Sequence, residues 1–443
     1  MKSVDYLILG GGWAGLLIAN EIASKFRGSS ITVLESSSDN NLGGLLRSEY
    51  IDSFTFDTGG PHILFSKNKE ILGMITDILG ANVRRLERKA VVYYENKYVP
   101  YPFENGIYVL DPKKRTKIGI GIIKAMLENA RNPEWKPTTF KDWIYGFFGE
   151  EMGSSYLEPY NKKIWKTDPG KMDASWVFSP GRLPFPVLED IILSIAGIES
   201  IGYKEQQYFY YPAEGGIFSL YKGLLEKIQK ANVNLISNFT VTNIKKISGS
   251  WVINDVISAK KVISTLPLSI LPEIMGLPHE ISNLCKQFKW NQDTVVGVSL
   301  NIPSPNEHVV YVPSPEINFH RLTWMSNLAG APAGLSNLIA ETTAPSDESV
   351  NIEETIEKTI IGLIKMNIIK SKEQILFVKA WHNKFAYPVY EIGHLEARAR
   401  VFEYFKEIGF LSVGRWGSWH YWNTDKVLEA VLALTNELSE SVS

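Results

Sequence analysis

The sequence predicts a mixed α/β fold, α+β over the whole chain, because three patterns follow one another along its 443 residues. A strand, a glycine-rich turn and a helix open the chain and lead into a second strand that ends in an acid. Amphipathic stretches between about residues 115 and 200 have the helical period, and segments between about 290 and 385 alternate as strands do. These patterns predict a Rossmann-like nucleotide-binding domain, a helical insertion and a mostly antiparallel sheet domain.

The opening turn has the glycine spacing of a dinucleotide-binding motif. Gly10 permits a sharp turn, Gly12 lets the backbone approach a pyrophosphate, and Gly15 lets the helix close on the strand. The helix N-terminus would direct its amide hydrogens and the positive end of its dipole at the phosphates. Glu35 follows the last glycine at the spacing of about 20 residues that suits a ribose hydroxyl. A bound dinucleotide is therefore predicted, against the alternative of a merely glycine-rich turn.

Two further glycine pairs favour FAD over NAD. Gly43-Gly44 follows the acid closely, and Gly59-Gly60 ends another short strand. A flavin needs such pairs because its diphosphate and ring system must lie along bare backbone. The alternative is that each pair is an ordinary turn. Together with the first motif, the pairs predict an FAD-binding domain.

Composition excludes several classes of protein. Lysine plus arginine (46) nearly balance aspartate plus glutamate (48), so no strong field favours nucleic acid. The single cysteine, Cys285, cannot form an internal disulfide, and the seven histidines lack ligand spacing, so no metal site is predicted. No apolar run approaches the roughly 18 to 20 residues that span a bilayer, and no signal peptide is seen. We therefore expect a cytoplasmic protein without a transmembrane segment.

Changes of pattern predict three units, of which the first is discontinuous. The FAD-binding domain is expected over 1–90, 205–275 and 405–443, the helical insertion over 91–204 and the antiparallel substrate domain over 276–404. Helices are predicted at 16–26, 117–131, 140–148, 217–229 and 424–438. Strands are predicted at 233–236, 240–247, 251–256, 262–265, 294–302, 319–325, 338–342 and 375–381. Near the C-terminus a strand enters a helix through Gly414-Arg415, which is again a geometry for phosphate or the flavin edge.

Two arginines and two tyrosines form a candidate diphosphate site. Arg182 lies between two prolines and is hard to bury without an anion, and Arg321 lies in the sheet region. Tyr387 and Tyr421 could donate hydrogen bonds to the same group. The alternatives are a surface position for the arginine and ordinary packing for the tyrosines.

Ordered motifs over nearly the whole length make the chain resemble UDP-galactopyranose mutases, particularly the eukaryotic type. The most specific of them is the C-terminal Gly414-Arg415-Trp416-Gly417-Ser418-Trp419-His420-Tyr421 with Asn423. The others include Tyr98-Val99-Pro100-Tyr101-Pro102-Phe103, Pro159-Tyr160-Asn161 with Trp165, Tyr211-Pro212-Ala213-Glu214-Gly215-Gly216, and Tyr387-Pro388.

The resemblance implies a reaction without net redox change, in which reduced FAD acts as a nucleophile on the anomeric carbon of a nucleotide sugar. NADPH or NADH is a candidate reductant. Arg182, Arg321 and His62 would be catalytic. Cofactor contacts would come from Gly10, Gly12, Trp13, Ala14, Gly15, Glu35, Gly43, Gly44, Gly59, Gly60, Val241, Gly414, Arg415, Asn423 and Thr424. Substrate contacts would come from Tyr101, Glu104, Tyr156, Asn161, Trp165, Gln206, Tyr387 and Tyr421.

Several positions depart from the family pattern. Pro61 separates Gly60 from His62, as in the bacterial branch, and Glu104 stands where the family has a glutamine that touches uracil. A carboxylate cannot donate the hydrogen bond of the amide. Gln206 and Leu328 replace a sugar-contacting asparagine and a tyrosine. The nucleobase and the sugar therefore stay open at this point.

Two other functions compete with the mutase. An oxidase of the amine oxidase or protoporphyrinogen oxidase kind would share the glycine motifs and the fold. A flavin-binding interaction protein that has lost its pocket would also explain the departures. The sequence indicates no oligomeric state.

Overall fold

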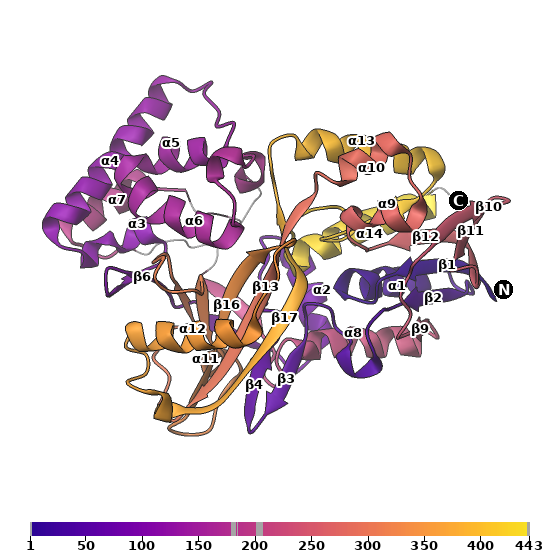
Figure 1. Ribbon diagram of the computed structural model, residues 1–443, viewed down its shortest axis with the longest axis horizontal. Coiled ribbons are helices and arrows are strands. Elements are labelled where there is room, and N and C mark those ends of the chain that lie inside the picture. The colour runs from indigo at the N-terminus through magenta and orange to yellow at the C-terminus, as the bar shows by residue number, and fades with distance from the viewer. Residues whose placement is uncertain (1, 179–182, 184, 201–206, 441–443) are drawn as a thin grey trace.

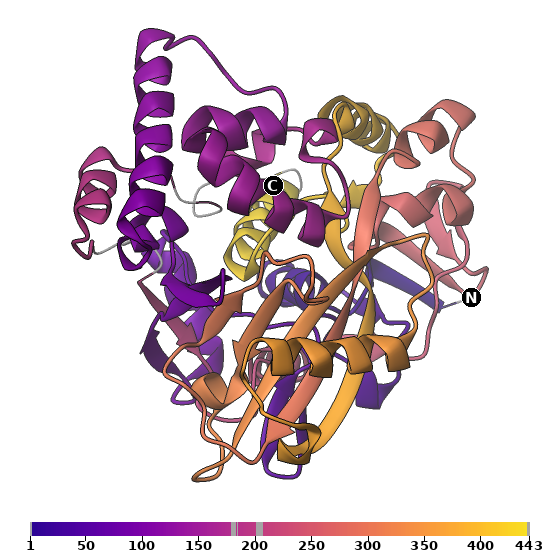
Figure 2. The same cartoon turned by 60° about the vertical axis from the view of Figure 1, so that its left-hand side comes forward.

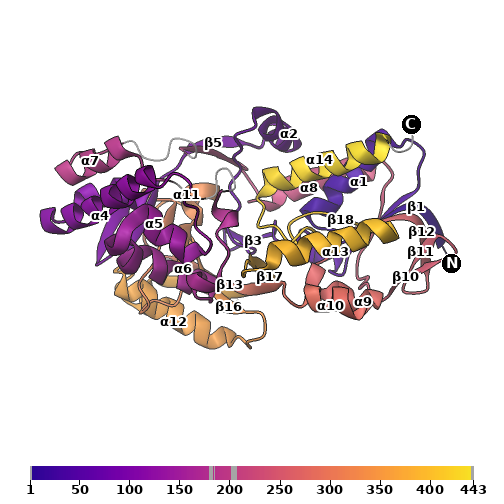
Figure 3. The same ribbon diagram turned by 90° about the horizontal axis from the view of Figure 1, so that it is seen from above.

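The computed structural model describes residues 2–178, 183, 185–200 and 207–440, and it contains two seven-stranded sheets and a helical region. Figure 1 shows the nucleotide-type sheet with its helices on the right, the second sheet at the lower centre and the helical region at the upper left. Figure 3, seen from above, places the two ends of the chain on the same side as that first sheet. The mixed α/β fold class, with a Rossmann-like domain beside a sheet domain, is confirmed.

The first sheet is built around β1 (Lys2–Leu9), whose last three residues, Leu7, Ile8 and Leu9, are fully buried. Such a continuous apolar run is typical of a parallel strand that is covered on both faces. Parallel pairing joins β1 to β2 (Ile31–Leu34) and β12 (Ile257–Ser264), β2 to β9 (Asn234–Ile236), and β12 to β18 (Leu411–Ser412). Antiparallel strands β11 (Ser250–Ile253) and β10 (Ile244–Ile247) complete it.

Three helices from distant parts of the chain pack on this sheet and on one another. They are α1 (Trp13–Lys25), α8 (Phe218–Lys230) and α14 (Thr424–Glu440): α1 packs on β1 and β2, and α8 and α14 each pack on α1. Helix α14 therefore packs on the helix that follows the opening strand, as the proposed discontinuous first domain requires.

The helical region contains α3 (Phe103–Gly106), α4 (Pro112–Arg131), α5 (Phe140–Met152), α6 (Glu158–Trp165) and α7 (Leu188–Ala196). Helix α4 begins five residues before the predicted 117 because Pro112 occupies its first turn and the Asp111 side chain accepts a hydrogen bond from the Lys114 amide. Helix α5 begins where predicted, with a capping box between Thr139 and Asp142.

The second sheet is antiparallel except at one pair. Its order is β17 (Ile375–Val389), β13 (Lys289–Leu300), β16 (Ser336–Pro345), β15 (Arg321–Trp324), β14 (Val309–Tyr311), β6 (Ala90–Tyr94) and β7 (Lys97–Pro100), and the β14 and β6 pair is parallel. Helix α12 (Ile352–Lys365) lies across one face of this sheet in Figure 2. Residues 91–100, which the sequence analysis assigned to the helical insertion, therefore pair with this sheet instead. We therefore propose the same three domains, with residues 91–100 placed in the sheet domain instead of the helical insertion.

The remaining elements connect these parts. They are β3 (Ser48–Ile51), β4 (Phe54–Asp57), α2 (Lys69–Leu79), β5 (Arg84–Glu87), β8 (Tyr208–Tyr211), α9 (Leu271–Met275), α10 (His279–Cys285), α11 (Met325–Ala329) and α13 (His394–Ile408). The predicted strand 240–247 shortens to β10 because the amides of Thr242 and Asn243 donate to the Asn254 side chain instead of a neighbouring strand. None of the helices in the described part of the chain is long and apolar enough to cross a bilayer.

The close packing of α1 on the glycine turn gives a first prediction. A methyl group at Gly15 would lie 1.9 Å from the carbonyl oxygen of Gly10, which is backbone and cannot rotate away. We expect Gly15→Ala to lower the free energy of unfolding by about 1–3 kcal/mol in urea titrations. Gly73→Ala in α2 is the matched control, since nothing lies within 4 Å of the added methyl, and it should gain about 0.5–1 kcal/mol. Equal stability of Gly15→Ala and the unchanged protein would contradict the packing argument.

Candidate functional site

Two cavities meet between the sheets. The first, of about 360 Å³, is called here the glycine cleft, and the second, of about 270 Å³, the aromatic cavity. Five residues line both: Leu45, His62, Arg415, Asn423 and Thr424. A ligand in the cleft can therefore present one end to a second ligand in the cavity.

The glycine cleft has the features that a dinucleotide requires. Its wall includes the predicted residues Gly10, Gly12, Trp13, Ala14, Gly43 and Gly44. Gly12 is the N-cap of helix α1 and has no side chain to cap it, so the first amides of the helix receive no side-chain cap. A methyl group built on Gly12 would meet nothing within 4 Å, which leaves room for phosphate at the positive end of the helix. These residues fit the diphosphate of FAD.

Glu35 secures the glycine turn. Its two carboxylate oxygens accept hydrogen bonds from the amides of Gly11 and Ser37, each at 2.7 Å. Ser37 lines the cleft, so the carboxylate lies beside the wall where the motif predicts a ribose. Two carboxylate oxygens have about four acceptor sites, so these bonds leave acceptor capacity for a hydroxyl.

Arg321 is held by a buried acid in the floor of the aromatic cavity. Arg321 and Glu341 lie directly opposite each other on β15 and β16, and Nε and Nη2 donate to the two carboxylate oxygens at 2.5 and 2.6 Å. The Glu341 side chain is 1% exposed. Burial alone would lower the pKa of Arg321, but the carboxylate beside it raises that pKa well above its ordinary value. The guanidinium is therefore permanently charged, with Nη1 not used by Glu341.

Gly60 makes this ion pair sterically feasible. Its φ is +87°, and a methyl group there would lie 2.8 Å from a Glu341 oxygen. Gly60 does not line the cavity itself but leaves room for the ion pair of Glu341 with Arg321. Gly59, its neighbour, does line the cavity, and a methyl group there would lie 2.2 Å from the carbonyl oxygen of Leu45.

His62 lies at the junction of the two cavities and is neutral. Burial, and then the positive charges of Arg415 and Arg321, lower the pKa of His62 to about 3. Its Nε2 has no hydrogen-bond partner among the described residues. A neutral imidazole with one unused nitrogen at this junction can accept or donate a hydrogen bond to a ligand.

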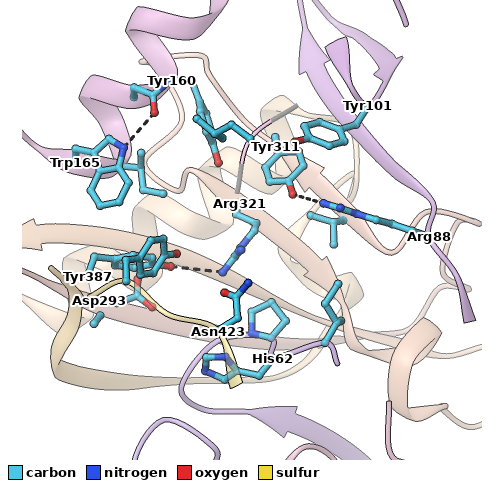
Figure 4. Close-up of a pocket in the computed structure, with 18 of the residues that line it drawn as sticks. His62, Arg88, Tyr101, Tyr160, Trp165, Asp293, Tyr311, Arg321, Tyr387 and Asn423 are labelled. Atoms are coloured by element: carbon cyan, nitrogen blue, oxygen red, sulfur yellow. Dashed lines mark hydrogen bonds between the residues drawn. The ribbon is translucent and has the colours of Figure 1, made fainter. Parts of the chain in front are cut away.

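The tyrosines and Arg415 surround the guanidinium of Arg321. The Tyr387 hydroxyl donates to Glu341 at 3.1 Å and accepts from Arg321 Nη2 at 3.4 Å, the second contact being drawn in Figure 4. Arg415 lies over the Tyr421 ring at 4.3 Å from its centroid, and its Nη2 donates to the Ala386 carbonyl at 2.5 Å. Two cations and two phenols thus converge on the cavity.

Asn161 and Trp165 lie one helical turn apart on α6 at the cavity wall. The indole Nε1 donates to the Asn161 side chain at 3.1 Å, and the Asn161 amide donates to the Leu157 carbonyl at 2.8 Å. Trp165 also meets Tyr387 and Tyr421 edge-on, with centroid distances of 6.2 and 5.7 Å. The pair is therefore a rigid wall facing the tyrosines.

The far end of the cavity is aromatic and contains an unpaired acid. Tyr156 stacks on Phe103 with ring centroids 4.5 Å apart, and Tyr101 lies under the guanidinium of Arg88. Glu104 is 2% exposed, and its Oε1 has no hydrogen-bond partner in the described part of the chain. Burial, and to a smaller extent Asp190, raises the pKa of Glu104 to about 7. A large share of this side chain is therefore protonated at neutral pH, and then it can donate a hydrogen bond.

Of the predicted site residues, most line one cavity or the other. Those that line neither are Gly15, Glu35, Gly60, Val241 and Gly414. For Gly15, Glu35, Gly60 and Gly414 the role is to shape the turns beside a cavity; a methyl group on Gly414, for example, would lie 2.8 Å from Ala14. No such role is seen for Val241, which packs against the core. Arg182 and Gln206 lie outside the described residues.

Sequence reasoning missed two acids at the cavity floor. Glu341 and Asp293 both stand within strands whose residues are mostly buried, β16 and β13. An acid in such a strand is itself a signal, because a buried charge needs a partner. Sequence reasoning also missed Arg88, which donates to the Tyr311 hydroxyl at 2.8 Å on the cavity wall.

Comparison with known proteins supports the fold. Residues 8–78 match the model of an NAD(P)-binding Rossmann-like domain. A structure of reduced UDP-galactopyranose mutase is similar over 99% of this chain and 94% of its own, with a TM-score of 0.87 and 22% identity.

Two structures named as oxidases share the fold with lower TM-scores and lower sequence identity. A protein from Exiguobacterium sp. 255-15 that is assigned as a protoporphyrinogen oxidase has a TM-score of 0.75 and 16% identity over 99% of both chains. Cyclohexylamine oxidase from Brevibacterium oxydans has a TM-score of 0.67 and 14% identity, over 98% of this chain and 99% of its own. The fold is therefore a Rossmann-like nucleotide-binding domain joined to a sheet domain, a class that serves more than one reaction.

The ion pair gives a second prediction. Arg321→Ala should lower the free energy of unfolding by about 3–5 kcal/mol, because it leaves Glu341 buried without a partner. The double variant Arg321→Ala with Glu341→Gln should recover part of that loss, since no charge is then left unpaired. Denaturant titration of the single and double variants measures the coupling. Additive losses would show that the pair contributes nothing to stability.

The unpaired Glu104 gives a third prediction. Because its pKa is higher in the folded state, it contributes stability that is fully present at low pH and is lost as pH rises through about 7. Glu104→Gln should remove this decline. The free energy of unfolding of the variant, relative to that of the unchanged protein, should therefore increase by about 3 kcal/mol between pH 4 and 8. Thermal unfolding across that range measures it. Glu437→Gln, at an exposed position on α14, should not show this growth.

Proposed function

We propose that the chain is an FAD-dependent nucleotide-sugar mutase that interconverts pyranose and furanose forms, UDP-galactopyranose and UDP-galactofuranose or a related pair. The observation that carries the proposal is the junction of the two cavities. It would place the end of a dinucleotide from the glycine cleft against the cations and phenols of the aromatic cavity. The similarity to reduced UDP-galactopyranose mutase supports it.

Reduced FAD would supply a nucleophilic nitrogen for the anomeric carbon, and the chain would supply position and charge. Arg321 and Arg415 would stabilise the negative charge of the departing diphosphate, and Tyr387 and Tyr421 would donate hydrogen bonds to it. Arg182 is proposed for the same role from its sequence position. NADPH or NADH remains the candidate reductant.

The rest of the cavity would bind the two ends of the substrate. Asn161 and Trp165 would contact the sugar, and His62 would lie between sugar and flavin at the junction. Tyr101, Glu104 and Tyr156 would contact the base. With its proton, Glu104 offers both a donor and an acceptor, as the family's glutamine also does, so this departure is compatible with uracil.

The second candidate is an FAD-dependent oxidase. Its support is the fold shared with cyclohexylamine oxidase and with the Exiguobacterium protein. The cations in the cavity favour the mutase, because they would attract an anionic diphosphate and repel a protonated amine substrate.

Turnover separates these functions. The flavin-loaded protein, reduced and kept without oxygen, should convert UDP-galactofuranose to UDP-galactopyranose without consuming reductant stoichiometrically. An oxidase should instead consume oxygen with its substrate. Absence of turnover with every nucleotide sugar tested, together with oxygen uptake on an amine, would replace the mutase by the oxidase.

A fourth prediction concerns the shape of the cation at the cavity floor. Arg321→Lys keeps a positive charge for Glu341 but loses the paired donors of the guanidinium. We expect kcat to fall on the order of 100-fold with the flavin still bound. Arg131→Lys, on the exposed surface of α4, is the control and should keep full activity. Full activity of Arg321→Lys would argue against its role in stabilising the leaving group.

A further inference from the structure

Asp293 is an acid at the cavity floor whose Oδ1 has no partner. It lies on β13, lines the aromatic cavity and is 2% exposed, and its Oδ1 has no hydrogen-bond partner in the described part of the chain. Its neighbours across the sheet are Thr343 on β16 and Asn383 on β17, neither of which is a cation. The sheet thus buries this carboxyl without a counter-ion directly opposite.

The charged groups that face Asp293 do not provide a counter-ion for an ionised Asp293 carboxylate. Arg321 on β15 already pairs with Glu341 on β16 through both carboxylate oxygens. Tyr387 on β17 donates its hydroxyl to Glu341 rather than to Asp293. His62, from the segment after β4, is neutral at pH 7. An ionised Asp293 would therefore be a second carboxylate beside a pair that is already complete, which is costly in a buried site.

The protonation of this one group sets the charge of the floor. Arg321 and Arg415 contribute two positive charges and Glu341 one negative charge, so the floor has one net positive charge if Asp293 is neutral. If Asp293 is ionised, the four groups sum to zero. A diphosphate binds a positive floor and gains little from a neutral one.

We propose that Asp293 is held as a neutral carboxylic acid and that its proton keeps the cavity floor positive, so that an anionic diphosphate binds there. This inference rests on the proposed function for the identity of the anion. Burial, and then the negative charge of Glu341, raises the pKa of Asp293 well above its ordinary value, in agreement with the geometry. Asp293 is a positioning residue in this account, because it acts through the field around Arg321 and Arg415.

The affinity for UDP at different pH values tests the proposal. In the flavin-loaded protein, the Kd for UDP measured by calorimetry should rise by about tenfold or more as pH increases through the pKa of Asp293. Asp293→Asn is the isosteric neutral variant, so it should bind UDP as the unchanged protein does at pH 6 and should not share that rise. The titration of UDP itself is common to both proteins and cancels in the comparison.

Asp5→Asn is the matched control for the same chemical change. Asp5 is an acid at the start of the first sheet that pairs with Lys260 at 2.7 Å, away from the cavity. Its variant should follow the pH profile of the unchanged protein. Parallel profiles for Asp293→Asn and the unchanged protein would overturn the proposal, as would loss of UDP binding in a folded, flavin-loaded Asp293→Asn protein.

Infrared spectroscopy tests the proton without any ligand. A carboxylic-acid C=O band should be present in the unchanged protein at pH 7 and should be weaker in Asp293→Asn but not in Asp5→Asn. If this band difference is found while UDP fails to bind at any pH, the neutral acid stands and the nucleotide-sugar function fails. If UDP binds and the band difference is absent, the function stands and this inference is wrong.

Discussion

The ion pair between Arg321 and Glu341 is the interaction on which the candidate site depends. Two neighbouring strands present the guanidinium and the carboxylate at the same register position, so their pairing follows from the sheet itself. A buried bidentate pair fixes the guanidinium plane far better than a flexible surface arginine could be fixed. Tyr387 and Gly60 are arranged around this pair, the first by hydrogen bonds and the second by its missing side chain.

The pair also reduces the net positive charge that Arg321 offers to an anion in the cavity. An arginine alone would be a simple anion receptor, whereas here its charge is already met by one carboxylate. Arg415, packed on Tyr421, then contributes the positive charge that no acid opposes directly. Recognition of an anion is therefore a property of the whole group of side chains.

Local patterns predicted the first sheet, helix α1 and helix α5, because glycine spacing, apolar runs and helical periodicity are all readable within a few residues. Helix α12 was not predicted, although Asn351 caps it and it has a clear apolar face. The long-range pairing of β14 with β6 in the second sheet was not readable. The parallel alignment of Val309 with Ala90 joins segments whose sequences contain no sign of each other.

Strand pairing also decides which parts of the candidate site could be predicted from the sequence. The glycines, Tyr387, Tyr421 and Arg321 were predicted from motifs, but the partner of Arg321 was not, since only sheet register brings Glu341 opposite it. Asp293 was missed because its environment is made by three strands and a distant loop. Motifs thus predicted many of the residues that line the two cavities, and only the structure showed how the charges there are balanced.

Closure of the first sheet by β18 has a consequence for biosynthesis. Strand β18 pairs with β12, and Asn423 and Thr424 contribute to both cavities just before or within α14. During translation, the glycine turn at residues 10–15 leaves the ribosome long before these segments are made. The glycine cleft lacks part of its wall until synthesis has passed Val427, so a shorter nascent chain has to stay soluble without a complete cleft.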